Sequence, residues 1–374
     1  MRKVRLNIII LIALALLTQA SWATTTFDPS LVAFGARPLG LGGAFIGLAD
    51  DTNAVFLNPA GIAALEQWSM TSMYTSILDT VDYNLLGGTY KTDYGTFGIG
   101  YIGTSSPAGY RTGASSTEVF EKISYGTSTF IFSYANYVNE LIDLDFLPEN
   151  TLIGANLKMQ TQGLTDSDSY SGTGYNLDLA VLSSFSERAK VGATLTNAIP
   201  NTMAWSSDLT ESMPSALNIG GAFNVMEGDQ PLTAVADARL DFESGLTLHG
   251  GLEWKPMEYL SIRCGVDEKK AEDAEKAISS VYNLTAGIGF MYEGVSFDYA
   301  YCQDGYLTAN QTHYFSISYS PALKKPEVKK TAEYKVDEYG YIEIGEKKKK
   351  NIDLEKELEV DLEQENNPDL YVDE

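Results

Sequence analysis

The sequence predicts an all-β protein: a fourteen-stranded antiparallel transmembrane β-barrel with an N-terminal hatch in its lumen and a C-terminal periplasmic tail. Three observations predict it. Segments of about ten residues alternate apolar and polar side chains along most of the chain. Aromatic residues close the apolar faces of several segments, as in the girdles of membrane barrels. The connections between consecutive segments also alternate between short and long.

Composition agrees with this fold class. The 374 residues include 33 Gly, 23 Tyr and 15 Phe, and only 20% are charged, which suits strands, turns and boundary aromatics. The mean hydropathy of -0.12 is too polar for a helical membrane protein, whereas a barrel averages lipid-facing and lumen-facing residues. The net charge of -24 argues against nucleic acid as a partner, because nucleic acid is itself negative.

Residues 1–23 are predicted to be a signal peptide. Arg2, Lys3 and Arg5 precede the apolar run Leu6–Leu17, and Ser21-Trp22-Ala23 offers a small-x-small cleavage site. The run is shorter than the roughly twenty residues that a spanning helix needs. We therefore expect export and a location in a bacterial outer membrane, with membrane lipid as one partner.

Residues 67–320 are predicted to form the barrel. In the segment 245–256, Leu248, Leu252 and Trp254 share one face, and His249 and Glu253 lie on the other. A soluble sandwich would alternate in the same way, but it would not place its long connections on one rim. The fourteen predicted strands are 67–77, 82–92, 95–103, 126–138, 150–163, 173–185, 188–197, 214–226, 231–242, 245–256, 258–267, 281–292, 294–303 and 311–320.

The connections predict which rim faces outward. Those after even-numbered strands are mostly short, and 139–149 is the exception. Those after odd-numbered strands are often long, and 243–244 is the exception. Long loops outside the cell and short periplasmic turns are the bacterial pattern. The predicted long loops are 104–125, 164–172, 198–213, 268–280 and 304–310.

Residues 24–66 are predicted to be the hatch, because a barrel of intermediate width needs filling. Glycines at 40, 42 and 43 let backbone approach the wall or turn with positive φ, and Asn58-Pro59 disfavours helix and fixes a turn. The alternative is a packing plug that contacts no ligand. The motif residues are Gly35, Gly40, Gly42, Gly43, Asp50, Asp51, Asn58, Pro59, Ala60 and Gly61.

These residues, in the stretches GARPLGLGGAF, ADD and NPAG, resemble the N-terminal signature of the FadL/PorV superfamily of outer-membrane barrels, on its PorV/PorQ-like side. The resemblance extends to about Pro321 and implies a fourteen-stranded barrel with a hatch. It also implies that hydrophobic cargo can leave through a kink in the third strand. In this chain Gly98, Gly100 and Gly103 are the candidate lateral gate, because glycines weaken a strand ladder.

A polar track is expected on the lumen face of neighbouring strands. Opposite charges on adjacent strands can satisfy each other inside a polar lumen. The track serves either as a gate for cargo or as a salt-bridged wall that steadies the barrel. Its residues are Asp237, Arg239, Asp241, His249, Glu253 and Arg263.

The sequence does not predict an enzyme or a cofactor. The two histidines, His249 and His313, fall in no nucleophile or metal pattern. The tail, residues 321–374, carries ten Lys against sixteen Asp plus Glu and has too few apolar residues for a core.

Two functions remain open. The chain is either a transporter of small hydrophobic molecules through a hatch-plugged lumen, or a PorV-like accessory subunit of a secretion system. The accessory subunit would dock clients or periplasmic proteins through its outer loops and its tail. Apolar patches on those loops would favour docking. The candidates are Phe120, Ile123 and Tyr125 in 104–125, and Met203 and Trp205 in 198–213.

Overall fold

The computed structural model describes residues 28, 34–77, 80–112, 119–141, 147–148, 150–165, 169–199, 202–272, 278–305 and 311–321. The predicted signal peptide lies outside these residues, as does the predicted tail apart from Pro321.

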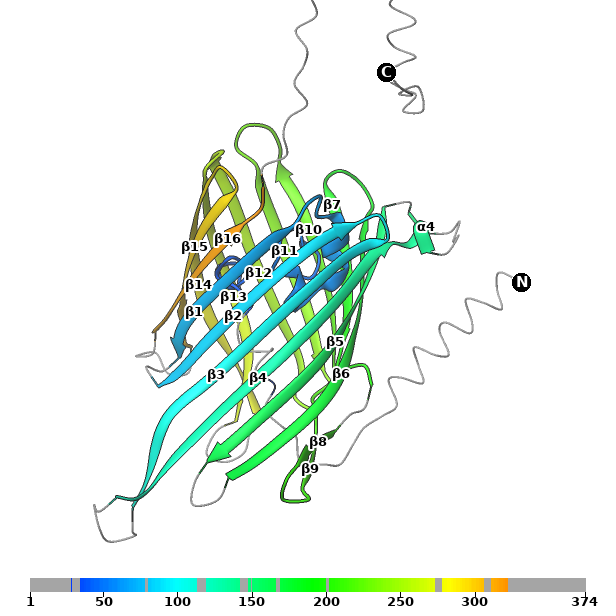
Figure 1. The fold of residues 1–374 in the computed structure, drawn as a ribbon. Coiled ribbons are helices and arrows are strands. Elements are labelled where there is room, and N and C mark those ends of the chain that lie inside the picture. The colour runs from blue at the N-terminus through cyan, green and yellow to red at the C-terminus, as the bar shows by residue number, and fades with distance from the viewer. Residues whose placement is uncertain are drawn as a thin grey trace, which may run out of the picture. The chain divides into compact units, whose positions relative to one another are not determined.

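Fourteen antiparallel strands close into a barrel, because β1 pairs with β16 and β5 pairs with β6 (Figure 1). Two further strands, β8 (Thr202–Trp205) and β9 (Thr210–Ser212), form a small hairpin attached to β6. The barrel strands are β1 (Ser69–Ile77), β2 (Val81–Thr92), β3 (Gly95–Thr112), β4 (Val119–Tyr137), β5 (Thr151–Thr165), β6 (Ser169–Ser184), β7 (Ala189–Thr196), β10 (Ala216–Met226), β11 (Leu232–Asp241), β12 (Gly245–Met257), β13 (Leu260–Glu272), β14 (Ile278–Tyr292), β15 (Val295–Gln303) and β16 (Gln311–Tyr319).

The two rims of the barrel differ, and we name them by their connections. At the turn end, 93–94, 258–259 and 293–294 are tight turns, and the longer connection after β4 contains α4 (Val138–Leu141). The loop end carries the connections after β1, β3, β5, β7, β11, β13 and β15.

Three of the predicted long loops are largely strand instead. Strand β3 continues to Thr112 and β4 begins at Val119, so most of 104–125 is paired hairpin. The stretch Ser105–Gly109 contains turn-type residues, but a bulge between Ser106 and Gly109 absorbs Pro107, which lacks a backbone donor. Residues 164–172 and 268–280 shorten in the same way.

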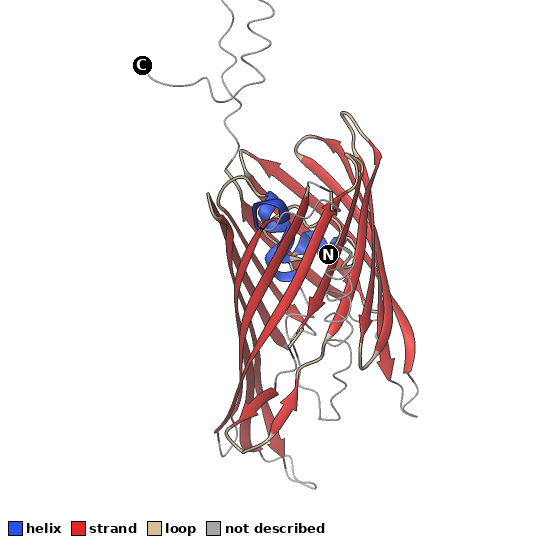
Figure 2. Cartoon of the chain, turned by 90° about the vertical axis from the view of Figure 1, so that its right-hand side faces the viewer, coloured by secondary structure: helices blue, strands red, loops and turns tan. Residues whose placement is uncertain are grey.

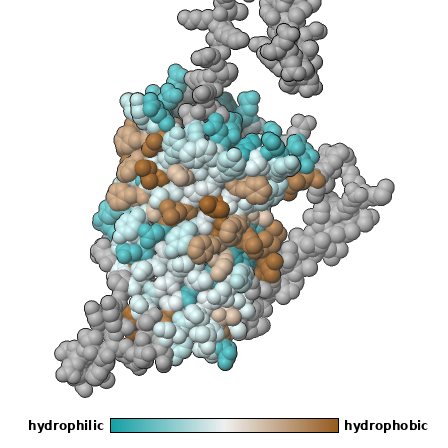
Figure 3. Space-filling model, viewed as in Figure 1, coloured by the Kyte–Doolittle hydropathy of each residue, from teal (hydrophilic) through white to brown (hydrophobic). Residues whose placement is uncertain are grey.

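The predicted alternation is confirmed on the outside of the wall. Along β12, Leu246, Leu248 and Leu252 are exposed, whereas Thr247 and Glu253 are buried toward the lumen. Figure 3 shows hydrophobic residues gathered across the middle of one outer face. Within the described ranges, no helix is apolar and long enough to cross a bilayer.

Residues 34–66 lie inside the barrel, near its turn end (Figure 2). They form α2 (Ala36–Gly40), α3 (Ala54–Leu57) and the 3-10 helix η2 (Pro59–Ala64). Phe45, Val55 and Ile62 of this N-terminal segment belong to one core with inward residues of the wall, such as Tyr83 and Leu85. The segment therefore supplies much of the buried apolar surface of the barrel.

Candidate functional site in the barrel lumen

The N-terminal segment contacts the wall through glycines of the barrel strands. A methyl group on Gly251 of β12 would lie 2.5 Å from the carbonyl oxygen of Leu41, and one on Gly265 of β13 would meet the backbone of Gly42. A methyl group on Gly47 would lie 2.5 Å from the Cα of Gly221 of β10. Only glycine allows backbone to pack on backbone at such distances.

Further wall glycines receive the rest of the segment. The ring of Phe56 occupies the hollow that Gly87 and Gly100 leave, and these two glycines are directly paired between β2 and β3. A methyl group on Gly154 of β5 would meet the backbone of Pro59 and Ala60. The segment is thus seated in a belt of wall positions that have no side chain.

The motif residues of the segment hold its own turns. Gly42 and Gly43 have φ of 69° and 80°, in the left-handed region that glycine favours. Asn58 is fully buried, and its Nδ2 donates to the carbonyl of Ile46 over 2.7 Å while its Oδ1 accepts from the amide of Ala60. A side chain on Gly61 would collide with the carbonyl of Ala49. These residues stabilise the segment from within.

Arg37 is the centre of an ion network that ties the segment to the wall. Its Nε and Nη2 donate to the two carboxylate oxygens of Glu253, each over 2.9 Å, and its Nη1 donates to Asp50 and Asp51 over 2.6 and 2.7 Å. Burial alone would lower the pKa of the Arg37 guanidinium, but the carboxylates of Asp50, Glu253 and Asp51 outweigh burial and raise the pKa well above its usual value.

The network continues across the wall. Arg263 of β13 donates to Glu253 and to Asp298 of β15, over 2.6 Å in each case. Buried charges are stable only when paired in this way. Asp298 and Arg37 were not among the predicted site residues, because their partners are far away in the sequence. The signal that could have found Arg37 is a charged residue within an otherwise apolar motif.

The predicted polar track is two clusters at different levels of the lumen. Glu253 and Arg263 belong to the Arg37 network. Arg239, Asp241 and His249 lie toward the loop end, where Arg239 pairs with Asp241 at 3.4 Å and His249 Nδ1 lies 3.0 Å from Asp267 Oδ1. All of them face inward as predicted, but they do not form one continuous line.

Asp237 is in register with His249, at the segment side of the loop-end cluster, and binds the segment itself. Its Oδ2 accepts from the backbone amides of Phe45 and Ile46 over 2.7 and 2.9 Å. A methyl group on Gly220 would collide with its other oxygen, so the carboxylate fits only because β10 has glycine there.

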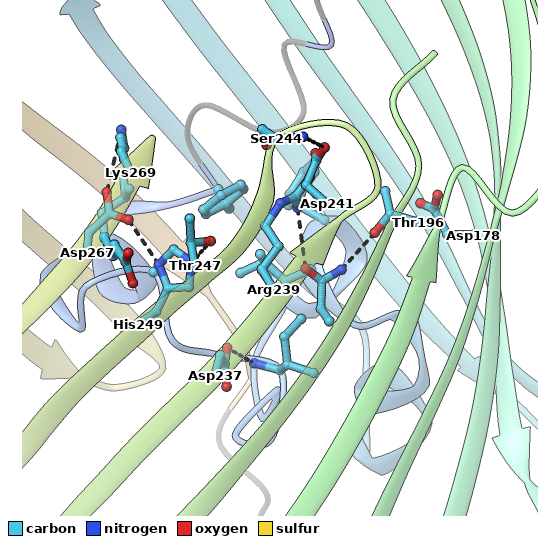
Figure 4. Close-up of a pocket in the computed structure, with 18 of the residues that line it drawn as sticks. Asp178, Thr196, Asp237, Arg239, Asp241, Ser244, Thr247, His249, Asp267 and Lys269 are labelled. Atoms are coloured by element: carbon cyan, nitrogen blue, oxygen red, sulfur yellow. Dashed lines mark hydrogen bonds and ion pairs between the residues drawn. The ribbon is translucent and has the colours of Figure 1, made fainter. Parts of the chain in front are cut away.

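A cavity of about 350 Å³ lies on the loop-end side of the segment (Figure 4). Phe34, Leu39, Ile46, Phe56 and Leu57 form its apolar floor. Its walls come from β4 to β7 and from β10 to β13, and they are polar apart from Ile131 of β4.

A second cavity of about 710 Å³ lies at the turn end. Arg37, Asp51, Lys255 and Arg263 line it together with the β14–β15 turn. The two cavities adjoin the same strands at different heights: β12 gives Thr247 to the first and Lys255 to the second. The N-terminal segment therefore separates two spaces in one lumen.

The candidate lateral gate is closed in this structure. Strand β3 pairs without interruption with β2 and β4 through Gly98, Gly100 and Gly103. A methyl group on Gly98 would lie 3.2 Å from Ile62 of the segment. Close approach of the segment explains Gly98 and Gly100, and their role as a gate stays a prediction.

Met203 and Trp205, two of the residues expected to form apolar docking patches, are not exposed on the loop. Met203 of β8 is fully buried against Gly172 and Gly174 of β6. Trp205 is partly buried, and its Nε1 donates to Glu211 over 3.0 Å. The described part of the chain contains no group of three or more His, Cys, Asp or Glu residues that could hold a metal ion.

No family model and no curated protein matches this sequence. Solved structures do match. The toluene transporter TbuX of Ralstonia pickettii is 12% identical with a TM-score of 0.54, and the match covers 78% of this chain and 99% of the transporter. The monoaromatic hydrocarbon channel CymD is 13% identical with a TM-score of 0.54, over 79% of this chain and 98% of the channel.

The toluene transporter TodX of Pseudomonas putida is 12% identical with a TM-score of 0.51, over 79% of this chain and 98% of the transporter. The chain has the fold of these channels. At such low identities the likeness concerns the fold alone, and it agrees with the barrel that the resemblance to the FadL/PorV superfamily implies.

Proposed function

We propose that this chain is an outer-membrane channel for small hydrophobic molecules, and that residues 24–66, of which the structure describes 28 and 34–66, are its hatch. The observation that carries the proposal is the pair of lumen cavities separated by the N-terminal segment. A solute that crosses the barrel along its lumen has to pass the segment. The fold of the hydrocarbon channels and the apolar outer wall support the same function.

The hatch works as a fitted plug. Its backbone rests on wall glycines, and its charges are held by Glu253 and Asp237. Passage requires a local rearrangement of the segment, because the whole plug is joined to at least eight wall strands by these contacts. The hatch motif residues thus stabilise the closed conformation of the hatch, and the ion network with the wall determines how much free energy its rearrangement costs.

Uptake of a radiolabelled monoaromatic hydrocarbon tests the channel. Bacteria that lack a hydrocarbon channel, but carry this chain in their outer membrane, are expected to take it up several-fold faster than cells with an empty vector. The double variant Asn58→Ala with Pro59→Ala should change the uptake rate while the barrel stays folded. Equal uptake with and without the chain would refute transport.

The mass of the native assembly tests the competing function. A channel extracted in mild detergent should run as a barrel without stoichiometric partners. A large complex with other envelope proteins would instead indicate a PorV-like accessory subunit, for which the buried position of Met203 offers no support.

A further inference from the structure

The loop-end cavity combines an apolar floor with walls that are strongly polar. The five floor residues defined above are all contributed by the N-terminal segment. The volume of about 350 Å³ is at the small end of ligand pockets, which run to roughly 1,000 Å³. A molecule with a single ring or a short chain therefore fits the space.

The charges that line this cavity are already paired with one another. Each of its four basic side chains has a carboxylate partner: Lys158 with Asp178 at 2.9 Å, Arg239 with Asp241 at 3.4 Å, Lys269 with Asp267 at 3.5 Å and Lys270 with Glu268 at 3.1 Å. The remaining carboxylate, Asp237, accepts two backbone amides of the segment. The described lining residues therefore offer hydrogen bonds but no unpaired cation.

One row of polar side chains crosses three strands at the same level. Asn218 of β10 is in register with Arg239 of β11, and Arg239 is in register with Thr247 of β12. The Arg239 bonds to Asn218 and Asp241 are both 3.4 Å long, longer than charge-assisted bonds usually are. The guanidinium has five donors, so a ligand oxygen can accept from it without breaking an ion pair.

We propose that this cavity binds an uncharged amphiphile, a single ring or short chain carrying a hydroxyl or carbonyl group, in preference to a hydrocarbon or an ion of the same size. The apolar body rests on the floor, and the oxygen faces the row Asn218, Arg239 and Thr247. The inference rests on the proposed channel function and narrows its cargo.

Desolvation decides between the three classes of ligand. A hydrocarbon would displace water from the polar row without replacing its hydrogen bonds. A benzoate-like anion would place a second negative charge beside Asp241, whose carboxylate Arg239 already neutralises, and the two like charges would repel. Asn218 already bonds Thr196 and Arg239, and Thr247 already bonds His249, so the donors left for a ligand are those of Arg239. An uncharged oxygen accepts from one of them and leaves every ion pair intact.

Four ring compounds of matched size provide the test: para-fluorotoluene, para-fluorobenzyl alcohol, para-fluorobenzoate and para-fluorobenzylamine. Their binding to the full-length protein in lipid nanodiscs is followed by fluorine NMR, and empty nanodiscs correct for partition into lipid. We expect the alcohol to bind about tenfold more tightly than the other three, which corresponds to one hydrogen bond of roughly 1.4 kcal/mol.

Two isosteric variants test whether the preference for the alcohol arises at the polar row. Asn218→Leu and Thr247→Val should remove most of the preference for the alcohol. Thr104→Val is the matched control, because Thr104 pairs with Thr127 away from the cavity and should leave the preference unchanged.

Equal or tighter binding of fluorotoluene, or no binding of any of the four probes, would overturn the inference. Hydrocarbon uptake by cells is measured separately. Normal uptake together with no preference for the alcohol would refute only the inference, whereas absent uptake together with a clear preference would refute only the channel.

Discussion

Strand β12 passes two different environments within one lumen. Toward the turn end it presents Gly251 and Glu253 to the N-terminal segment, as a backbone contact and an ion pair. Toward the loop end it presents Thr247 and His249 to an open cavity. The same alternation of inward and outward residues therefore serves both: beside the segment the inward residues are a glycine that admits backbone and a glutamate that binds Arg37, and beside the cavity they are polar.

The largest expected effect comes from the ion network at the turn end. Glu253→Leu leaves the guanidinium groups of Arg37 and Arg263 without their shared carboxylate. Breaking a buried pair in this way costs about 3–5 kcal/mol. Heat-dependent gel mobility should show a less stable barrel, and planar bilayers should show larger single-channel conductance. Lys255→Leu on the same strand is the comparison: its Nζ also lies 3.7 Å from Glu253, but its side chain is 41% exposed, so losing this contact should cost little. Equal behaviour of the two variants would contradict a central role for the network.

The next largest effect is expected at Gly251 of β12, and the neighbouring Gly250 serves as its control. Gly251→Ala places a methyl group against the backbone of Leu41, whereas Gly250→Ala has its nearest heavy atom 3.7 Å away. We expect a loss of about 1–3 kcal/mol and a partly displaced segment for the first variant only. Conductance recordings on both variants check this. A leak in Gly250→Ala as large as in Gly251→Ala would show that the strand, not the contact, is responsible.

A smaller effect is expected at the boundary between the two environments. Asp237→Asn keeps one acceptor for the amides of Phe45 and Ile46 but loses the charge, at a cost of about 1 kcal/mol. Hydrogen exchange at these two amides should become faster. Asp229→Asn, in the exposed turn after β10, serves as the control. Unchanged exchange in Asp237→Asn would mean that the segment is held without this carboxylate.

The smallest effect is expected outside the lumen. Arg188 and Glu227 form an exposed ion pair of 2.7 Å between two turns. Exposed pairs contribute little because water and salt screen them. Arg188→Ala should leave both thermal stability and conductance unchanged. A clear loss in either would show that the turn end depends on its surface charges as well as on its interior.

Much of this architecture was predictable from sequence. The fourteen strands and their inward faces follow from period-2 alternation, because one face meets lipid and the other meets the lumen. The extensions of β3 and β4 were missed, since pairing between two strands overrides the turn-type residues at 105–109.

The arrangement inside the lumen was predictable only in part. Inward-facing charges could be named, but their height depends on the stagger of the strands, which alternation does not reveal. For this reason the sequence did not reveal that Glu253 and Arg263 lie at a different level of the lumen from Arg239 and Asp241. The contact between Arg37 and Glu253 joins residues 216 positions apart, and no local pattern encodes such a distance.

The seating of the segment also constrains the order of assembly. The backbone amide of Ala36 donates to Ser316 on the last strand, β16, and Gly40 touches Gly287 on β14. The N-terminal segment therefore reaches its final contacts only after the last strands of the barrel have been made. Pairing of β1 with β16 closes the barrel around the segment, so a chain that ends before β16 would lose both this pairing and the contact of Ala36 with Ser316.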